Sequence, residues 1–219
     1  MISQTEENYL KALFTLTNAK GEASVNELSK HLDIKMPTVN SMMKRMANKG
    51  FVLYESYKPL KLTEKGKKEA ALILRKHRLA EMYLVEKMGF GWEEVHDIAE
   101  QIEHLKSPIF FEKMDELLGY PKVDPHGSPI PDINGKIVSE HYIKLSSCKP
   151  GDQVVFMAVG SSSEELLKFL NSRNLILGEI ITIESFETFD GSMTVTYSDR
   201  TNEMFSSKVC NNLLVQMKR

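Results

Sequence analysis

The first third of the chain carries apolar residues at the spacing of three amphipathic helices. Ser3 and Ser24 each stand three residues before a glutamate, which is the capping-box pattern that opens a helix. We expect helices over residues 4–18, directly after Ser24, and over residues 36–49, where Pro37 suits a first turn. Short helices in this order are typical of a helix-turn-helix unit.

Two short runs of alternating apolar and polar residues follow these helices. They occupy residues 51–55 and 60–62, on either side of a four-residue turn, and predict a β-hairpin. The order of helix, short helix, turn, helix and hairpin predicts a winged helix-turn-helix, the first part of a mainly α chain with a small β component.

The middle of the chain predicts three further helices, over residues 63–88, 93–106 and 110–118, separated by glycines and a Ser-Pro step. Their apolar residues are too numerous for one thin layer of helices. We therefore expect this helical block to pack against a copy of itself in a homodimer. A turn-rich segment, residues 124–135, then predicts a linker.

Beyond about residue 141 the pattern changes to short alternating runs that predict β-strands. The runs are residues 153–159, 180–184, 193–197 and 213–215, with one short helix expected near 163–171. A segment of about 75 residues with this pattern predicts a small antiparallel barrel.

Charge is distributed unevenly along the chain. From Lys20 to Lys68, eleven Lys and Arg residues stand against five Asp and Glu, a net charge of +6, whereas the remaining residues sum to −8. This favours a polyanion such as DNA as partner of the winged helix, although a solvated basic face or a protein-binding winged helix would share the pattern. The side chains expected to contact DNA are Pro37, Thr38, Asn40, Ser41, Lys44, Arg45, Tyr57 and Lys58.

Composition narrows the class of protein. The 219 residues are 42% hydrophobic and 26% charged, which is ordinary for folded domains, and no apolar run approaches the roughly 20 residues of a membrane-spanning helix. The N-terminus lacks the pattern of a secretory signal, and Cys148 and Cys210 make no disulfide framework. We expect a cytoplasmic protein with no membrane segment.

Two neighbouring predicted helices each carry histidines and carboxylates on one face. The residues are His77 and Glu81 on the first helix and His96, Glu100, Glu103 and His104 on the second. Such faces build metal sites in helical bundles. Oxygen and nitrogen donors without a thiolate favour Mn²⁺ or Fe²⁺ over a structural Zn²⁺.

The same pattern has a simpler explanation. Acidic residues and histidines at helical spacing usually form a solvated, salt-bridged face, above all a lone pair such as His77 and Glu81. Asp124 and His126 in the predicted linker favour the metal site, because carboxylates buried together without a cation would be strongly destabilised.

Six segments spread over the chain carry a resemblance to a known family. They are Thr5-Glu-Glu-Asn-Tyr-Leu, Pro37-Thr-Val, Leu62-Thr-Glu-Lys-Gly, Arg75-Lys-His-Arg-Leu-Ala-Glu, Val95-His-Asp with the later Glu103-His104, and Gly127-Ser-Pro-Ile-Pro. Together they resemble the diphtheria-toxin-repressor-like (DtxR/MntR) metal-dependent transcriptional regulators in their three-domain form. The resemblance implies a DNA-binding domain over 1–70, a helical dimerisation and metal-binding domain with linker over 71–140, and an SH3-like (FeoA-type) β-barrel over 141–219.

The resemblance also implies which residues bind metal. The primary site would use Asn8, Glu100, Glu103 and His104, and the second site would use His77, Glu81 and His96. Asp124 and His126 sit where manganese-sensing members place a pair of linker ligands. Glu164 or Glu165 is the nearest candidate in the barrel.

Two departures from the family pattern bear on the metal. Glu100 stands where iron-sensing members have a cysteine, and a carboxylate there is the manganese-sensing pattern. Asn8 replaces the Asp or Met of relatives with a neutral amide, and Lys11 on the same helix disfavours a close pair of ions. The resemblance implies a Mn²⁺-dependent repressor, alternatively an Fe²⁺-dependent one, with one or two ions per chain, that binds palindromic operator DNA as a homodimer and controls metal-homeostasis genes.

Two other classes of function remain open at this point. A carboxylate-rich site with an open metal position could activate water in a metal-dependent hydrolase, but the sequence has no nucleophile motif and no Gly-rich phosphate loop. A winged-helix interaction module, whose acidic face binds a partner instead of a metal, is the second alternative. We expect a regulator that is not an enzyme and has no small organic substrate.

Overall fold

The computed structural model describes residues 2–18, 20–138 and 141–218, which belong to two compact units. The first unit contains Met1–Ala80, Ile98–Lys122 and Ile130–Val138, and the second contains Glu81–Asp97, Val123–Pro129 and Ser139–Arg219. Residues 71–140, expected as one domain, contribute to both units.

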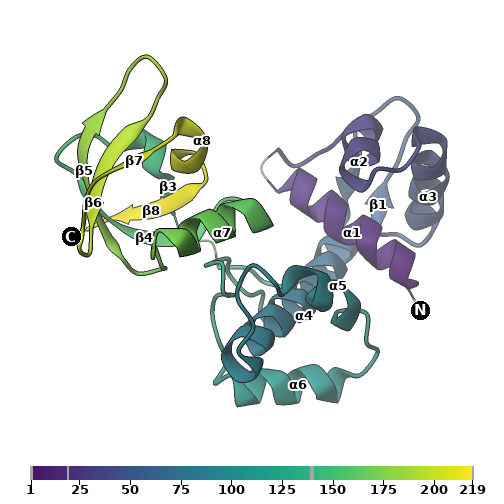
Figure 1. Ribbon diagram of the computed structural model, residues 1–219. Helices are drawn as coiled ribbons and strands as arrows, with labels where there is room; N and C mark the ends of the chain where they lie inside the picture. The colour runs from purple at the N-terminus through teal and green to yellow at the C-terminus, as the bar shows by residue number, and fades with distance from the viewer. Residues whose placement is uncertain (1, 19, 139–140, 219) are drawn as a thin grey trace. The chain divides into compact units, whose positions relative to one another are not determined.

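The N-terminal part of the first unit is a winged helix-turn-helix, as the sequence predicts. Helices α1 (Gln4–Thr17), α2 (Val25–Leu32) and α3 (Met36–Asn48) precede a hairpin of strands β1 (Val52–Leu53) and β2 (Lys61–Leu62). Figure 1 shows the three helices packed around β1. Both predicted capping boxes are present at the starts of α1 and α2.

An apolar core joins the helices of the winged helix-turn-helix. Leu10 and Leu13 of α1 are fully buried, as are Val39, Met43 and Met46 of α3. Burial of each such side chain contributes about 1.5–3 kcal/mol. Because the three α3 residues follow one another at four- and three-residue intervals, they fix one face of α3 on the core and turn the opposite face outward.

Glu6 is a buried carboxylate that ties the start of α1 to the end of α3. It is 2% exposed and accepts hydrogen bonds from the Ser3 N–H (2.9 Å) and from Lys49 Nζ (2.7 Å), with Arg45 Nε at 3.1 Å. Burial by itself raises the pKa of Glu6, but the bonds from Lys49 and Ser3 outweigh burial, so the net shift lowers this pKa.

Replacing Glu6 by glutamine is expected to destabilise the winged helix by about 1–3 kcal/mol at neutral pH, because buried charge-assisted hydrogen bonds are lost. A carboxylate with a lowered folded-state pKa stabilises the fold above its unfolded pKa, and this contribution is lost as the pH falls through the folded value. Urea unfolding followed by circular dichroism should therefore show a difference in free energy of unfolding between the wild type and Glu6→Gln, and this difference should become smaller in acid.

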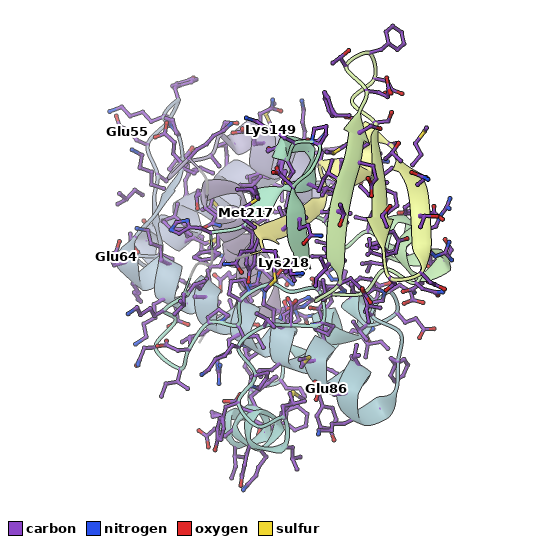
Figure 2. The ribbon with its side chains drawn as sticks, turned by 90° about the vertical axis from the view of Figure 1, so that its left-hand side faces the viewer. Glu55, Glu64, Glu86, Lys149, Met217 and Lys218 are labelled. Carbon is purple, nitrogen blue, oxygen red and sulfur yellow. The ribbon has the colours of Figure 1, made fainter. Side chains whose placement is uncertain are left out.

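Glu64→Gln is the matched control for this measurement. Glu64 lies at the start of α4 (Glu64–Met88), its side chain is 90% exposed, and it pairs with Lys67 on the surface (Figure 2). An exposed pair of this kind contributes less than about 1 kcal/mol. Equal effects of the two substitutions would contradict the role given to Glu6.

Helices α4, α5 (His96–Ile102) and α6 (Pro108–Leu117) form the helical middle of the chain. The predicted helix over 93–106 is too long, and the structure corrects it. Residues 92–94 form a turn in which the Gly91 N–H donates to Glu94 Oε2, and residues 103–104 form another turn directly after α5. None of the described helices is long and apolar enough to cross a membrane.

The second unit is built on a six-stranded antiparallel sheet. Its strands are β3 (Ile143–Lys144), β4 (Gln153–Val159), β5 (Ile180–Phe186), β6 (Met193–Tyr197), β7 (Arg200–Phe205) and β8 (Leu213–Met217). They pair in the order β3-β8-β4-β5-β6-β7, and Figure 2 labels Met217 at the end of β8. The predicted runs correspond to β4, β5, β6 and β8, whereas β3 and β7 were not predicted, because β3 has only two residues and β7 has little apolar alternation.

One core fills the interior of the second unit. Phe156, Tyr197 and Phe205 are fully buried between the sheet and two helices, α7 (Glu164–Ser172) and α8 (Ser207–Cys210). Figure 1 shows α8 beside β7. Cys148 and Cys210 are free and buried in this core, and burial raises the pKa of the Cys210 thiol to about 11. Both cysteines are therefore packing residues.

Residues 124–129 of the predicted linker belong to the second unit and pack against β4, whereas residues 130–135 belong to the first unit. The Val159 N–H donates to the carbonyl of His126 (3.0 Å). Gly127 has φ +83°, and a Cβ there would lie 2.1 Å from the carbonyl oxygen of Met157, so only glycine fits this approach. The segment that carries Asp124 and His126 is thus held in one conformation.

Candidate metal centres and nucleic-acid interface

Glu103 lies at the centre of a buried polar cluster in the first unit. It follows α5 directly and is fully buried. Its Oε2 accepts hydrogen bonds from His77 Nδ1 (2.7 Å) and from Lys11 Nζ (2.8 Å). Burial by itself raises the pKa of Glu103, but the bond from His77 and the charge of Lys11 outweigh burial, so the net shift lowers this pKa. Glu103 is therefore an anion at neutral pH.

Besides the Tyr9 hydroxyl, two buried oxygen atoms in this unit have no hydrogen-bond partner among the described residues. One is Glu103 Oε1, which lies 3.7 Å from His104 Nε2, and the other is Asn8 Oδ1. Asn8 stands one turn of α1 before Lys11, the residue that contacts Glu103. Buried acceptors without partners are costly, and a divalent cation satisfies several oxygen atoms at once. Glu103 Oε1 and His104 Nε2 therefore suit a metal, and Asn8 Oδ1 offers a further oxygen atom from α1.

Glu7 orients the imidazole of His104. Glu7 is 5% exposed and accepts a hydrogen bond from His104 Nδ1 (2.6 Å) and another from Lys106. Since a carboxylate only accepts, Nδ1 carries a proton, and in the neutral ring Nε2 then has the lone pair that a metal needs. Glu7 was not among the predicted site residues. The signal for it was its place on one face of α1 with Asn8 and Lys11.

Lys11 and His77 complete the cluster around Glu103. Lys11 Nζ also donates to Glu100 Oε1, and His77 Nδ1 lies 4.0 Å from that same oxygen. Ligand atoms of His77, Glu100 and Glu103 all lie within 4.8 Å of one another. The sequence grouped His77 with Glu81, which stands four residues later on α4, and the structure also brings His77 to the carboxylates of the predicted primary site.

A second buried cluster lies within the second unit. Ligand atoms of Glu81, Asp124 and His126 lie within 4.8 Å of one another, and all three residues are buried. His96 Nδ1 is 3.5 Å from Glu81 Oε1, and His126 Nδ1 is 3.6 Å from Glu81 Oε2. The structure thus brings the two predicted linker residues to Glu81 of the predicted second site, and Glu81 also lies near His96 of that site.

Hydrogen bonds preorganise the linker residues of this second cluster. Asp124 Oδ1 accepts from the backbone N–H groups of His126 and Ser128, both at 2.9 Å. His126 Nε2 donates to the carbonyl of Trp92 (2.8 Å), which leaves Nδ1 directed at Glu81. Burial by itself lowers the pKa of His126, but its contacts with Glu81, Asp124 and Trp92 outweigh burial and raise the pKa. The cluster therefore favours a positive charge.

The two metal ligands predicted in the barrel, Glu164 and Glu165, belong to neither cluster. Glu164 and Glu165 are exposed at the start of α7, and Glu164 pairs with Lys168 on the same helix. Neither residue belongs to a cluster of potential ligands among the described residues.

The outward face of α3 carries most of the predicted DNA contacts. The exposed residues of this helix include Pro37, Thr38, Ser41, Lys44 and Arg45. Asn40 lies at the edge of this face, where its Oδ1 accepts a hydrogen bond from Tyr54 OH (3.2 Å) in the hairpin. Hydroxyl and amide groups at such a helix surface suit base edges, and the cations suit phosphates.

The hairpin supplies the remaining two predicted contacts. Tyr57 and Lys58 are exposed in the loop between β1 and β2, which also carries Glu55 (Figure 2). Tyr57 has φ +65°, a left-handed conformation that turns the loop sharply. This projecting loop with an aromatic and a basic side chain is typical of a wing that lies along a nucleic-acid backbone.

Helix α6 leaves large apolar side chains in contact with solvent. Ile109 is 66% exposed, Phe110 is 42% exposed and Leu117 is 60% exposed. Contiguous apolar residues on one helix indicate an interaction surface. This helix is the candidate for the expected contact between two copies of the chain.

Comparison with protein families matches two segments of the chain. Residues 1–60 match the family described as iron dependent repressor, N-terminal DNA binding domain. Residues 63–132 match the family described as iron dependent repressor, metal binding and dimerisation domain.

Individual relatives are a transcriptional regulator and an iron-dependent repressor. The HTH-type transcriptional regulator MntR of Oceanobacillus iheyensis is 30% identical over 140 residues, which cover 64% of this chain and 92% of that protein. The iron-dependent repressor IdeR of Mycobacterium tuberculosis is 36% identical over 129 residues, 59% of this chain and 56% of that protein. The match thus spans about half the length of the mycobacterial relative.

Solved structures resemble the chain over almost its whole length. A manganese-dependent transcriptional repressor in complex with manganese has a TM-score of 0.88 at 26% identity, covering 97% of this chain and 99% of that one. The IdeR of T. acidophilum has a TM-score of 0.77 at 28% identity and covers 100% of both chains.

Proposed function

Because the chain belongs to the DtxR/MntR family of iron- and manganese-dependent repressors, we propose that it is a transcriptional repressor that binds operator DNA when its metal centre is loaded. The observation that carries this proposal is the pair of unpartnered buried oxygens of Asn8 and Glu103, with His104 Nε2 beside the second. Members of this family are repressors, not enzymes.

The primary centre is proposed to use Asn8, Glu100, Glu103 and His104. When bound, a divalent cation would supply a positive charge shared by oxygen and nitrogen atoms from α1, from α5 and from the turn after α5. Glu7 holds the His104 tautomer, and α1 packs on the same core as α3. Residues that fix α1 therefore fix the recognition helix, so the DNA-binding conformation gains population when the centre is loaded.

Manganese is the proposed metal, with Fe²⁺ as the alternative. Every described donor of the two clusters is oxygen or nitrogen, and the two cysteines lie in the apolar core of the second unit. Hard carboxylate ligands suit Mn²⁺. We propose a second ion at Glu81, Asp124 and His126, with His96 as a further ligand, which gives one or two ions per chain.

DNA and a second copy of the chain are the proposed partners. The exposed face of α3 and the wing would contact a half-site, and the apolar residues of α6 would join two chains. Two copies related by two-fold symmetry read half-sites about 34 Å apart, which requires a palindromic operator. The proposed functional domains are residues 1–70, 71–140 and 141–219, and the proposed place of action is the cytoplasm.

Addition of Mn²⁺ to the metal-free protein is expected to raise its affinity for a selected palindromic DNA by about 100-fold. Each ligand must be deprotonated, so this gain is expected to disappear below about pH 6. Fluorescence anisotropy with anaerobic titration of Mn²⁺ and Fe²⁺ measures the gain and distinguishes the two metals. Operator affinity that is the same in EDTA and in saturating metal would contradict the proposal.

A further inference from the structure

Trp92 is attached to the core of the second unit by two kinds of contact. It lies in the turn between α4 and α5, and its side chain packs against that core, to which α7 contributes Leu167 and Leu170. Its indole Nε1 donates a hydrogen bond to Asn171 Oδ1 (2.7 Å) on the same helix. The apolar contact and the directed hydrogen bond together fix the position of the indole on α7.

Both the backbone and the ring of Trp92 contact His126 of the second cluster. The Trp92 carbonyl accepts the hydrogen bond from His126 Nε2 (2.8 Å). The indole stacks on the imidazole, with ring centroids 6.0 Å apart and ring planes 20° from parallel. Because Nε2 carries a proton, Nδ1 of the neutral ring has the lone pair that a metal needs, and it lies 3.6 Å from Glu81 Oε2. Trp92 therefore sets both the tautomer and the plane of this imidazole.

We propose that Trp92 is a positioning residue for the second metal ion and that it makes the affinity of this centre depend on α7. Partners that hold a ligand histidine in one tautomer and orientation are typically worth 10–100-fold in metal affinity. Asp124 is held by two N–H groups of its own loop, whereas the imidazole of His126 is held by Trp92, a residue far away in the sequence. A change at Asn171 therefore reaches the metal ligand through the indole. The inference rests on the proposed function, because it takes the second cluster to bind an ion.

The fluorescence of Trp92 reports directly on this centre, because the chain has no other tryptophan. Titration of paramagnetic Mn²⁺ into the metal-free protein is expected to quench the indole emission, and the quenching curve gives the affinity for the second ion. His126→Gln is expected to lose the quenching at the same Mn²⁺ concentrations. Glu103→Gln, which removes a ligand of the primary centre, is expected to keep it.

Two substitutions test the positioning role, with isothermal titration calorimetry as the measurement for both. Trp92→Leu keeps an apolar side chain but removes the stacked ring and the indole N–H, and it is expected to weaken binding of the second ion by about 10-fold or more. Asn171→Ala removes only the acceptor of the indole hydrogen bond, at an exposed position, and it is expected to weaken the second ion by about 3-fold. Binding of the first ion is expected to be unchanged in both variants.

Phe189→Leu and Asn48→Ala are the matched controls. Phe189 is a fully exposed aromatic residue between β5 and β6, and Asn48 is exposed at the end of α3, so wild-type binding of both ions is expected. If Trp92→Leu does not fold, Asn171→Ala decides alone.

Wild-type affinity for the second ion in both Trp92→Leu and Asn171→Ala would overturn the inference, and weakening in Trp92→Leu alone would overturn the link to α7. Wild-type emission that does not respond to Mn²⁺ would also overturn it, while Mn²⁺-dependent operator binding of the same protein would leave the proposed function standing. Weaker second-ion binding in both variants, together with operator affinity that does not depend on metal, would support the inference and contradict the proposed function.

Discussion

Replacement of Glu103 by glutamine is expected to abolish metal-dependent DNA binding while the chain stays folded. Glutamine keeps the shape of the side chain and an oxygen that can accept from His77 or Lys11. It removes the anionic charge and replaces the second oxygen by an NH₂ group, which cannot bind a cation. Loss of a supporting residue around a metal costs 10–100-fold in affinity, so loss of this ligand is expected to cost at least about 100-fold.

Isothermal titration calorimetry with Mn²⁺ measures the loss of metal affinity, and fluorescence anisotropy with operator DNA measures the loss of metal-dependent DNA binding. Glu64→Gln is the matched control, because Glu64 is 90% exposed at the start of α4 and pairs with Lys67 on the surface. The control is expected to bind metal and DNA as the wild type does. Wild-type operator affinity of the Glu103 variant in saturating Mn²⁺ would place the regulatory metal elsewhere in the chain.

The elements that the sequence predicted best are those with a strong local signal. The capping boxes at Ser3 and Ser24 satisfy helix N-termini within four residues, and both are present in the structure. The same reasoning overestimated α5, because the turn at residues 92–94 is stabilised by a side-chain bond to the backbone. Strand β7 carries one fully buried apolar residue, Phe205, in a polar run, so its pairing with β6 had no periodic signal.

The candidate metal residues were identifiable from helical spacing, but their partners were not. Spacing places residues on one face of a helix and leaves open what that face contacts. The contacts of Glu7 and Lys11 with His104 and Glu103 join residues more than ninety positions apart, and they depend on tertiary packing. The place of Glu7 on one face of α1 with Asn8 and Lys11 was visible in the sequence, but that spacing alone did not distinguish Glu7 from a solvated surface residue.

Replacing Gly66 by alanine has two opposing effects on stability. Alanine has the higher helix propensity, but its methyl group would clash with neighbouring atoms, and the clash is expected to have the larger effect. Gly66 lies in the first turn of α4, where alanine would normally stabilise a helix by about 1 kcal/mol. A Cβ at this position would lie 2.0 Å from the carbonyl oxygen of Phe51 and 3.1 Å from a methyl group of Leu62. Hydrogen bonds hold the Phe51 carbonyl in place. It accepts a hydrogen bond from the Thr63 N–H (3.0 Å), and the Thr63 hydroxyl in turn accepts one from the Gly66 N–H (3.0 Å).

Gly66→Ala is therefore expected to destabilise the winged helix by about 3 kcal/mol or more and to weaken DNA binding both with and without Mn²⁺. This pattern differs from that of Glu103→Gln, which removes only the metal-dependent part. Gly160→Ala is the control, because its nearest contacts lie at 3.6 Å or more and its φ is not positive, so a change within about 0.5 kcal/mol is expected. Urea unfolding of the wild type, Gly66→Ala and Gly160→Ala measures whether each substitution raises or lowers the free energy of unfolding. A stabilised Gly66 variant would mean that the wing and α4 move apart at little cost, and that the recognition helix is not held by their contact.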